Sequence, residues 1–343
     1  MKPDVLAGLT LAALGMPEVL GYARHRAHAG RHRARPVEPI SALIRGEGAT
    51  VSTPDAAPAL PADWLAAAEH RLAEAGVGSA SRDVEVLAEH VSSLPGEQRE
   101  QEFTALVERR AERVPLEHLI GRVTFRRIEL LVGPGVFVPQ PETSPVVQWA
   151  VDALQWRDSS GALRAPGASK RSVAPVCVDL CTGSGTIALS LAAEVPGAVV
   201  HAVEADPGAL EWAARNITHN DVTVRLHAGD AAGALPELDG QVDLVASNPP
   251  YVATGELTCV APEVLDFDPT VALHAGPDGL DVIRAVEATA RRLLRPGGLV
   301  VVEHSDRQGR SAPAVFAEAD DWDDVQDHPD HDGLDRFVTA VRR

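Results

Sequence analysis

The second half of the chain alternates apolar runs of strand length with segments of helical periodicity. A glycine turn follows the first run, and a Pro-Gly pair precedes the last. The expected strands are 175–180, 198–204, 222–228, 242–247 and 299–304, and the expected helices include 186–195, 206–216 and 278–294. Asp206 followed by Pro207 is typical of a helix start. Strict alternation of strand and helix predicts an α/β fold with a doubly wound, parallel sheet that is covered by helices on both faces.

Before this region the pattern is helical and then alternating. Apolar residues recur at helical spacing in 63–75, 81–91 and 98–113, with Asp63 and Ser81 at the expected N-caps, which predicts a small helical bundle. Residues 123–138 alternate and contain Gly133-Pro134-Gly135, which predicts a β-hairpin that turns at these three residues. A helix is expected from about Glu142 to Trp156, and a solvent-exposed loop from 157 to 174. The expected domains are an extension (1–58), the bundle (59–118), the hairpin with its linking helix (119–157) and the α/β domain (158–343).

The extension raises the question of a membrane segment. Residues 5–23 are mostly apolar but include Pro17 and Glu18, which disfavours a spanning helix. The arginines follow this stretch instead of preceding it, which is not the order of a secretory signal. We therefore expect a weakly ordered extension and no membrane association. Translation upstream of a true start at Val51 is one explanation of this segment, and a membrane anchor is the less favoured alternative.

The net charge and the cysteine content indicate which partners and which cellular compartment to expect. The chain of 343 residues has a net charge of −18, and residues 1–50 carry +3, which leaves −21 on the remainder. So acidic a body is a poor non-specific partner for nucleic acids, which are bound through clustered Lys and Arg. The three cysteines, Cys177, Cys181 and Cys259, form no CxxC pair. We therefore expect a cytoplasmic protein with no disulfide framework and no zinc or other metal site.

The unusual residues fall where the expected strands end, and the first group is a glycine turn. The segment DLCTGSG runs from Asp179 to Gly185, between the first strand and its helix. Its glycines permit a tight turn with close approach of a ligand to the backbone. Glu204 ends the second strand, where a carboxylate can accept hydrogen bonds from both hydroxyls of a ribose. Ala188 stands where a dinucleotide-binding motif requires its third glycine, so the pattern favours S-adenosylmethionine over NAD.

The second group is Asn248-Pro249-Pro250-Tyr251, directly after the fourth strand. The two prolines hold the segment rigid and remove backbone donors. The Asn248 carboxamide and the backbone carbonyls then form an array of acceptors that suits an NH2 group, and Tyr251 offers a flat face for a planar amide or base. This tetrapeptide together with the glycine turn indicates a methyltransferase that acts on planar amide or amino nitrogens.

With these motifs, the chain resembles the HemK/PrmC family of protein-glutamine methyltransferases that modify peptide chain release factors. The similarity runs from about Trp64 to Thr339 and includes LEHLIGRVTF, VFVPQPETS, DLCTGSGTIALSLA, SNPPYV, GPDGLDVIR and LLRPGGLVVVEH. It implies a class I S-adenosyl-L-methionine-dependent methyltransferase domain, with an N-terminal helical bundle that docks the substrate protein. The implied partner is a release factor, and the implied acceptor is the glutamine of its Gly-Gly-Gln loop.

The resemblance also implies roles for individual residues. Asn248, Pro249, Pro250 and Tyr251 would hold the substrate glutamine, and the cofactor-binding residues would be Asp179, Cys181, Thr182, Gly183, Ser184, Gly185, Glu204, Asp230, Ala231 and Asn248. Cys181 stands where the family often has glycine, and Ala231 lacks the aromatic ring of some members. Gln140 and Ser144 replace a commoner Arg and Glu.

Two other functions remain open on the sequence. A nucleic-acid adenine methyltransferase uses a similar Asn/Asp-Pro-Pro-aromatic turn, but it would need a basic cleft or a target-recognition domain. A docking protein that binds the cofactor without activity is disfavoured because both motifs are intact. His304, at the end of the fifth strand, is either a residue of the cofactor pocket or a packing residue. The aspartates between Asp320 and Asp332 are expected to form a solvated acidic edge.

Overall fold

The computed structural model describes residues 60–156, 174–259 and 261–343. The expected extension (1–58) and nearly all of the expected loop at 157–174 therefore lie outside the described residues. The chain divides into two compact units after Glu112. Among the described helices, each is too short or too polar to cross a membrane.

The described part of the first unit consists of three helices, α1 (Ala62–Glu74), α2 (Ala80–His90) and α3 (Gly96–Ala111), as the periodicity predicts. Their packing includes a buried ion pair in which Arg110 Nε donates to Asp83 Oδ2 at 2.6 Å. The expected capping was wrong at both places. Pro61 and Ser79 precede α1 and α2, and neither helix has a side-chain cap. Asp63 lies inside the first turn of α1, where its charge favours the helix dipole.

The second unit, from Arg113 on, contains the α/β domain. It opens with α4 (Leu116–Ile120), a two-stranded hairpin and α5 (Ser144–Trp156). The remaining elements are β3 (Val176–Leu180), α6 (Thr186–Glu194), β4 (Val199–Glu204), α7 (Pro207–His219), β5 (Val224–Ala228), β6 (Val242–Ser247), η3 (Thr254–Cys259), α8 (Pro262–Phe267), α9 (Asp281–Leu293), β7 (Leu294–Glu303), α10 (Ser311–Ala317), β8 (Trp322–Pro329) and β9 (Asp335–Arg342). Short 3-10 turns, η1 (Pro141–Thr143), η2 (Pro236–Leu238), η4 (Thr270–Ala272) and η5 (Asp306–Gln308), connect several of them.

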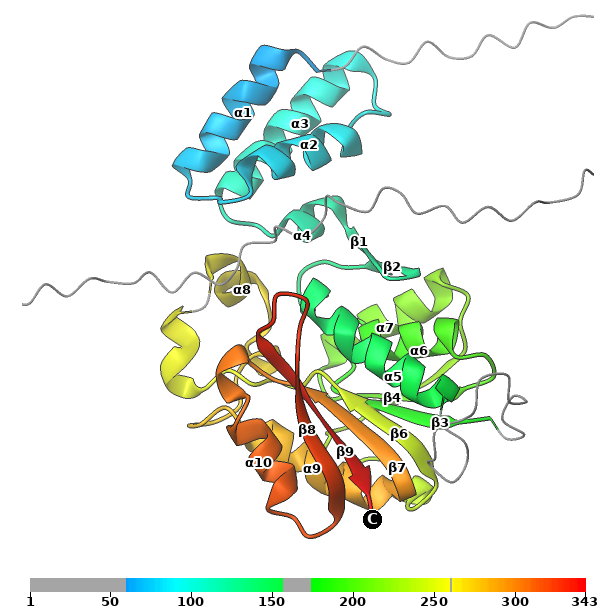
Figure 1. Ribbon diagram of the computed structural model, residues 1–343. Coiled ribbons are helices and arrows are strands. Elements are labelled where there is room, and N and C mark those ends of the chain that lie inside the picture. Colours follow the sequence, from blue (N-terminus) through cyan, green and yellow to red (C-terminus); the bar gives the residue numbers. More distant parts are fainter. Residues whose placement is uncertain (1–59, 157–173, 260) are drawn as a thin grey trace, which may run out of the picture. The chain divides into compact units, whose positions relative to one another are not determined.

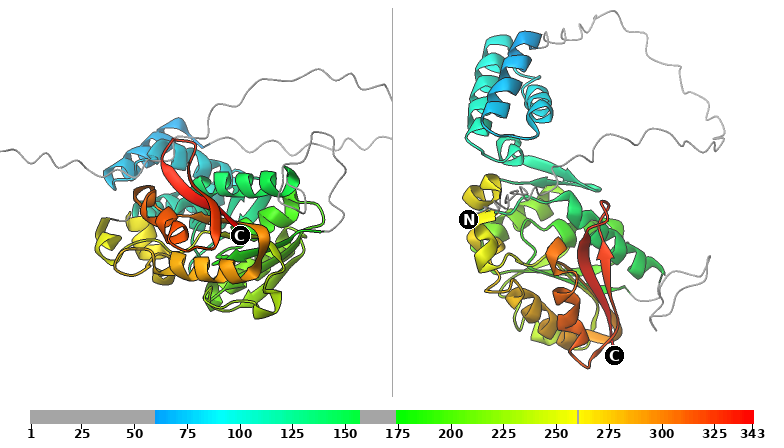
Figure 2. Two further views of the ribbon diagram at one scale, coloured as in Figure 1. Left: turned by 60° about the horizontal axis from the view of Figure 1, so that its bottom comes forward. Right: turned by 60° about the vertical axis from the view of Figure 1, so that its left-hand side comes forward.

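The seven-stranded sheet has the order β5-β4-β3-β6-β7-β9-β8, in which β3 to β7 are parallel and β9 is antiparallel to both neighbours. One core packs α5, α6 and α7 on one face, and a second core packs α9 and α10 on the other. Figures 1 and 2 show these helices on opposite sides of the sheet. The predicted doubly wound α/β fold is confirmed, and its strand order is that of a class I methyltransferase.

The hairpin is present, but its predicted turn is wrong. Strands β1 (Arg122–Phe125) and β2 (Ile128–Leu131) are joined at Arg126 and Arg127, not at Gly133–Gly135. Arg126 adopts a φ of 51°, which glycine usually provides. Its guanidinium is held by two hydrogen bonds to Glu194 of α6, of 2.7 and 2.8 Å. A tertiary ion pair therefore supports this turn, and a local sequence pattern does not reveal it.

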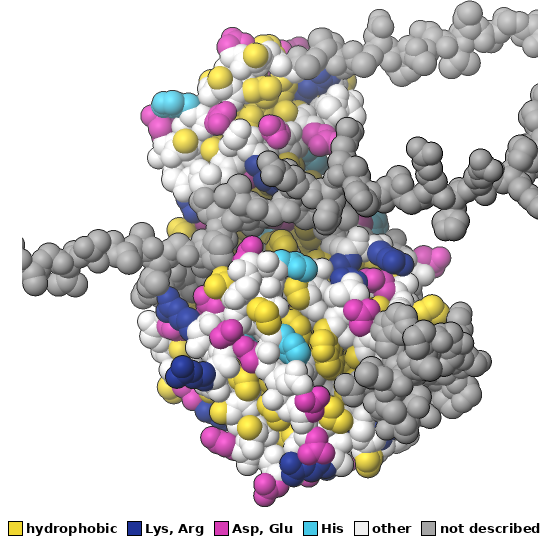
Figure 3. Space-filling model, in the orientation of Figure 1, with side chains coloured by type: hydrophobic (Ala, Val, Ile, Leu, Met, Phe, Trp, Pro, Cys, Tyr) yellow, Lys and Arg dark blue, Asp and Glu magenta, His cyan; other side chains and the backbone are white. Residues whose placement is uncertain are grey.

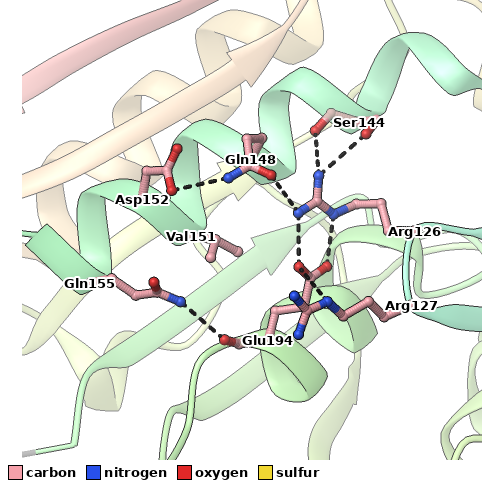
Figure 4. A pocket seen from close by; sticks show the side chains of 8 residues that line it. All are labelled: Arg126, Arg127, Ser144, Gln148, Val151, Asp152, Gln155 and Glu194. Carbon is pink, nitrogen blue, oxygen red and sulfur yellow. Dashed lines mark hydrogen bonds and ion pairs between the residues drawn. The ribbon is translucent and has the colours of Figure 1, made fainter. Parts of the chain in front are cut away.

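These groups line a polar pocket between the hairpin turn, α5 and the end of α6 (Figure 4). Arg126 also donates to the Ser144 hydroxyl at 3.3 Å and to Gln148 Oε1 at 2.8 Å. Ser144, which replaces a commoner Glu, thus contacts this arginine. Arg126 and Arg127 both pair with Glu194, while Asp152 accepts a hydrogen bond from Gln148 Nε2 at 3.0 Å, so the pocket joins the hairpin turn to α5 and α6.

The acidic segment near the C-terminus forms part of the sheet. Its aspartates lie on and around β8, an edge strand that the sequence pattern did not predict. Several are paired with arginines, as Asp321 is with Arg342 and Asp323 with Arg343. Figure 3 shows acidic and basic side chains interspersed over one face of the unit. Charges on an edge strand discourage pairing with other chains.

Candidate functional site

The register of the sheet brings the ends of four strands together. Leu180 of β3 pairs with Val203 of β4 and with Ser247 of β6, and Ser247 pairs with Val302 of β7. The residue that follows each of these positions therefore lies at one edge of the sheet. These residues are Cys181, Glu204, Asn248 and Glu303. In open α/β sheets, ligands bind at this carboxyl edge.

The glycine turn wraps tightly around the end of β3. Thr182 N donates to Val203 O at 3.0 Å, and Gly185 N donates to Thr182 O at 2.8 Å. Gly183 and Gly185 have φ values of 56° and 93°. A Cβ on Gly185 would lie 2.4 Å from Leu189 Cδ1, whereas a Cβ on Gly183 would meet no atom within 4 Å. Gly185 is therefore required for packing, and Gly183 faces open space that a ligand can fill.

The side chain of Asp179 stabilises the glycine turn by hydrogen bonds. Its side chain is fully buried, and Oδ2 accepts hydrogen bonds from Thr182 Oγ1 at 2.5 Å and from Ala188 N at 3.0 Å. Burial raises the pKa of Asp179 to about 7, although both hydrogen bonds favour the ionised form. Asp179 thus fixes the turn to the start of α6.

Glu204 closes the turn from the neighbouring strand. Its Oε2 accepts the N–H of Gly183 at 2.8 Å, and its Oε1 accepts the N–H of Asp206 at 2.9 Å. Each carboxylate oxygen retains a lone pair for a further donor. Asp206 also caps α7 by accepting from Ala209 N at 2.9 Å, which confirms the predicted helix start. The Glu204 carboxylate is thereby held in place, and both of its oxygens can accept a further hydrogen bond.

Cys181 adopts a φ of 60°, the left-handed conformation that favours glycine. Burial is the main cause that raises the pKa of its thiol, and the nearby Glu204 carboxylate raises it further. The thiol is therefore neutral. The backbone at Cys181 keeps the left-handed conformation that a glycine would adopt at this position.

The end of β5 completes this side of the site. Asp230 is exposed and accepts from Ala232 N at 2.8 Å. Ala231 is buried, and its carbonyl accepts from Thr289 Oγ1 at 2.7 Å. The negative charge of Asp230 contributes to the raised pKa of the Cys181 thiol.

The Asn248–Tyr251 segment leaves β6 as a turn that other elements hold in place. Val252 forms a bridge with His274, and the carbonyl of Tyr251 accepts from Gln308 Nε2 at 3.3 Å. The same nitrogen donates to Gly279 O at 3.1 Å. The Asn248 side chain is half-buried, and its Nδ2 lies 3.2 Å from Thr143 Oγ1. The segment is thus held in place by contacts with several other parts of the chain.

Together these residues fit S-adenosylmethionine. The open space over Gly183 and the spare acceptors of Glu204 lie beside each other, because the two residues are hydrogen-bonded. In the part of the chain that the structure describes, no group of three His, Cys, Asp or Glu side chains is arranged to hold a metal ion.

Sequence reasoning missed three residues of this edge, namely Glu303, Thr143 and Gln308. Glu303 is 2% exposed, and the side chains of Thr143 and Asn248 lie beside its carboxyl group and lower its pKa. An acidic residue that ends an apolar strand was the available signal, and it is the same signal that indicated Glu204. His304 is a packing residue, with Nε2 2.8 Å from Asp327 Oδ1 and Nδ1 2.9 Å from Ser305 O.

Comparison with known families gives two matches. The model of the PrmC N-terminal domain matches residues 63–121, and that of the methyltransferase small domain matches residues 168–266. The first match covers the three-helix unit and α4, and the second covers the glycine turn, Glu204 and the Asn248 segment.

Several curated proteins are similar over most of the chain. A release factor glutamine methyltransferase of Streptomyces coelicolor is 50% identical, with 80% of this chain and 96% of that protein aligned. One of Mycolicibacterium smegmatis is 43% identical, over 81% and 96%. A 4-amino-L-phenylalanine/4-methylamino-L-phenylalanine methyltransferase of Streptomyces pristinaespiralis is 40% identical, over 84% and 96%.

Proposed function

Because this chain belongs to the family of release factor glutamine methyltransferases, we propose that it methylates the side-chain amide nitrogen of a glutamine in a peptide chain release factor. The acceptor that we propose is the glutamine of the Gly-Gly-Gln loop. The observation that supports this most directly is the rigid Asn248–Tyr251 turn, which leaves its strand beside the glycine turn and presents acceptors for an NH2 group.

The chemistry requires positioning more than acid–base catalysis. The cofactor S-adenosyl-L-methionine supplies, when bound, a methyl group on a positively charged sulfur. An amide nitrogen is a poor nucleophile because its lone pair is delocalised. We propose that Asn248 Oδ1 and the Pro249 carbonyl each accept one N–H of the substrate amide. The nitrogen lone pair then points at the methyl group of the cofactor. Such positioning can lower the activation barrier by several kcal/mol.

The remaining assigned residues act on the cofactor and on the substrate loop. Glu204 would accept hydrogen bonds from ribose hydroxyls, and the turn from Thr182 to Gly185 would hold the amino-acid part. Pro250 and Tyr251 would line the slot for the planar amide. The flanking glycines of the loop suit a narrow slot, because they carry no side chains. We propose that the helices of residues 62–111 contribute to docking the release factor.

The test compares methyl transfer from labelled S-adenosylmethionine to four acceptors. These are a folded release factor, its isolated loop peptide, 4-amino-L-phenylalanine and an adenine-containing oligonucleotide. We expect rapid transfer to the folded release factor and much slower transfer to the peptide. Transfer to 4-amino-L-phenylalanine or adenine, with none to the release factor, would contradict the proposal. Asn248→Ala should lower kcat by about 10²- to 10³-fold while cofactor affinity changes only a few-fold.

A further inference from the structure

The buried carboxyl of Glu303 lies directly behind the Asn248 segment. Glu303 ends β7, and the preceding Val302 pairs with Ser247, which precedes Asn248. Only 2% of the Glu303 residue is exposed. The polar side chains of Thr143 and Asn248 lie beside this carboxyl and lower its pKa, while the buried Oε2 has no hydrogen-bond partner among the described residues. Burial of a carboxyl oxygen without a hydrogen-bond partner costs free energy.

The protein can use both N–H groups of the Asn248 side chain. Its Nδ2 donates to Thr143 Oγ1 at 3.2 Å, and the unpartnered carboxyl of Glu303 lies beside the same carboxamide. An amide nitrogen has two N–H groups, and a threonine has one O–H. When Glu303 is ionised it only accepts, so it can take the O–H of Thr143 and the second N–H of Asn248. Both donors of Asn248 are then used on the protein side, and Oδ1 is left for another partner.

On the basis of the proposed function, we propose that Glu303 is a positioning residue for methyl transfer. With Thr143 it holds the Asn248 carboxamide in the one orientation that presents Oδ1 to the substrate NH2. A carboxamide turned by 180° would place Oδ1 against the Glu303 carboxylate and would present donors to the substrate amide. Ionised Glu303 therefore excludes the orientation that cannot bind the acceptor nitrogen.

The charges around Glu303 give this arrangement a pH dependence. The pKa of Glu303 is raised to about 7, mainly by burial and in part by the charge of Glu142 of η1. The polar side chains of Thr143 and Asn248 and the charge of Arg336 of β9 oppose this effect. Tyr251 and the adjacent His304 are the other titratable groups at this end of β7, with Asp306 in the following turn. Arg336 is itself held by Asp330, at 3.1 and 3.0 Å. Below pH 7 Glu303 gains a proton, can donate to Oδ1, and no longer selects one orientation.

The first experiment measures kcat, KM and cofactor affinity of Glu303→Gln between pH 5.5 and 9, on the acceptor that the wild-type enzyme uses. Glutamine keeps the size of the side chain but can donate to Oδ1. We expect a 10- to 100-fold lower kcat at pH 8, with KM and cofactor Kd changed less than about threefold. The wild-type kcat should rise with pH through about 7, and the variant should lack this rise.

Two further variants keep the test decisive if Glu303→Gln does not fold. Thr143→Val should lower kcat in the same way, and Thr143→Ser should restore it. Glu142→Gln is the matched control, because Glu142 acts on Glu303 through its charge and is not among the hydrogen-bond partners of Asn248. It should keep the high-pH kcat and move the midpoint to lower pH.

Results of two kinds would overturn the positioning role. One is a wild-type kcat with no rise near pH 7, or a Glu303→Gln variant that retains it. The other is a loss of activity that appears in cofactor Kd instead of kcat. A wild-type enzyme that methylates 4-amino-L-phenylalanine but no release factor would refute the proposed function alone, since the Glu303 comparison is then made on that amine.

Discussion

The carboxylate of Glu204 accepts the backbone N–H of Gly183 at 2.8 Å, so the end of β4 and the glycine turn after β3 form one rigid unit. Glu204→Ala should remove both this support and the acceptor for the ribose. We expect cofactor binding to weaken by about 1–3 kcal/mol, the scale for hydrogen bonds to a charged group. Calorimetric titration with S-adenosylmethionine measures this loss. Glu211→Ala is the matched control, because Glu211 is exposed on α7 and pairs with Arg215 at 3.6 Å. An unchanged affinity in Glu204→Ala would contradict the assignment.

Cys181 has a positive φ that a side chain disfavours, which predicts an unusual order of stability. At ordinary positions, alanine is more stabilising than glycine. Here Cys181→Gly should be more stable than Cys181→Ala by roughly 1 kcal/mol, because a left-handed conformation costs about 1–2 kcal/mol for a residue with a Cβ. Urea denaturation of both variants gives the difference directly. Alanine more stable than glycine would show that the turn does not have this backbone conformation in solution.

The pocket at the hairpin turn contains one buried and one exposed ion pair, and both involve Glu194. The side chains of Arg126 and Glu194 are 13% and 6% exposed, whereas that of Arg127 is 76% exposed and lies 3.7 Å from the same carboxylate. Arg126→Ala should destabilise the fold by about 3 kcal/mol or more, because Glu194 is left buried and poorly compensated. Arg127→Ala should cost less than about 1 kcal/mol. Equal effects of the two variants on chemical denaturation would refute this distinction.

Glu303 should reduce stability at high pH. Its pKa is about 7 in the fold against about 4.5 when exposed, so the folded protein disfavours the ionised form. The cost is absent below pH 4.5, grows as the pH rises through this interval, and is complete above pH 7. Glu303→Gln should therefore raise the melting temperature relative to wild type at pH 8 and much less at pH 5. A difference that is independent of pH would mean that Glu303 does not titrate in this interval.

The sequence predicts those features that depend on local pattern. The five parallel strands, the start of α7 at Asp206 and the glycine turn were all predicted, because buried strands and helix caps have strong local signals. The turn at Arg126 was not, since its support comes from Glu194, which lies 68 residues away in the chain. Strand β8 was missed because it is mostly polar and lacks the continuous apolar run of a buried strand. Strand β9 was also missed, although its residues 337–340 are buried between β7 and β8.

The candidate site shows the same division. The sequence indicated residues at the carboxyl ends of strands, such as Asn248 after β6 and Glu204 at the end of β4. It did not indicate Thr143 or Gln308, whose contacts with the Asn248–Tyr251 turn come from elements distant in the chain. Glu303 carried a signal at its strand end, but only the contact with Asn248 gives it a role. Residues that hold the site residues in place are thus identified from tertiary contacts and not from the sequence pattern.

Locating the transferred methyl group by mass spectrometry tests glutamine methylation most directly. The wild-type protein is incubated with S-adenosylmethionine and a folded release factor, and the peptide that contains the Gly-Gly-Gln loop is fragmented. We expect one methyl group on the side-chain nitrogen of that glutamine, and none when the glutamine is replaced by glutamate, because the NH2 is then missing. An unmodified loop, together with methylation of 4-amino-L-phenylalanine or of adenine, would contradict the account.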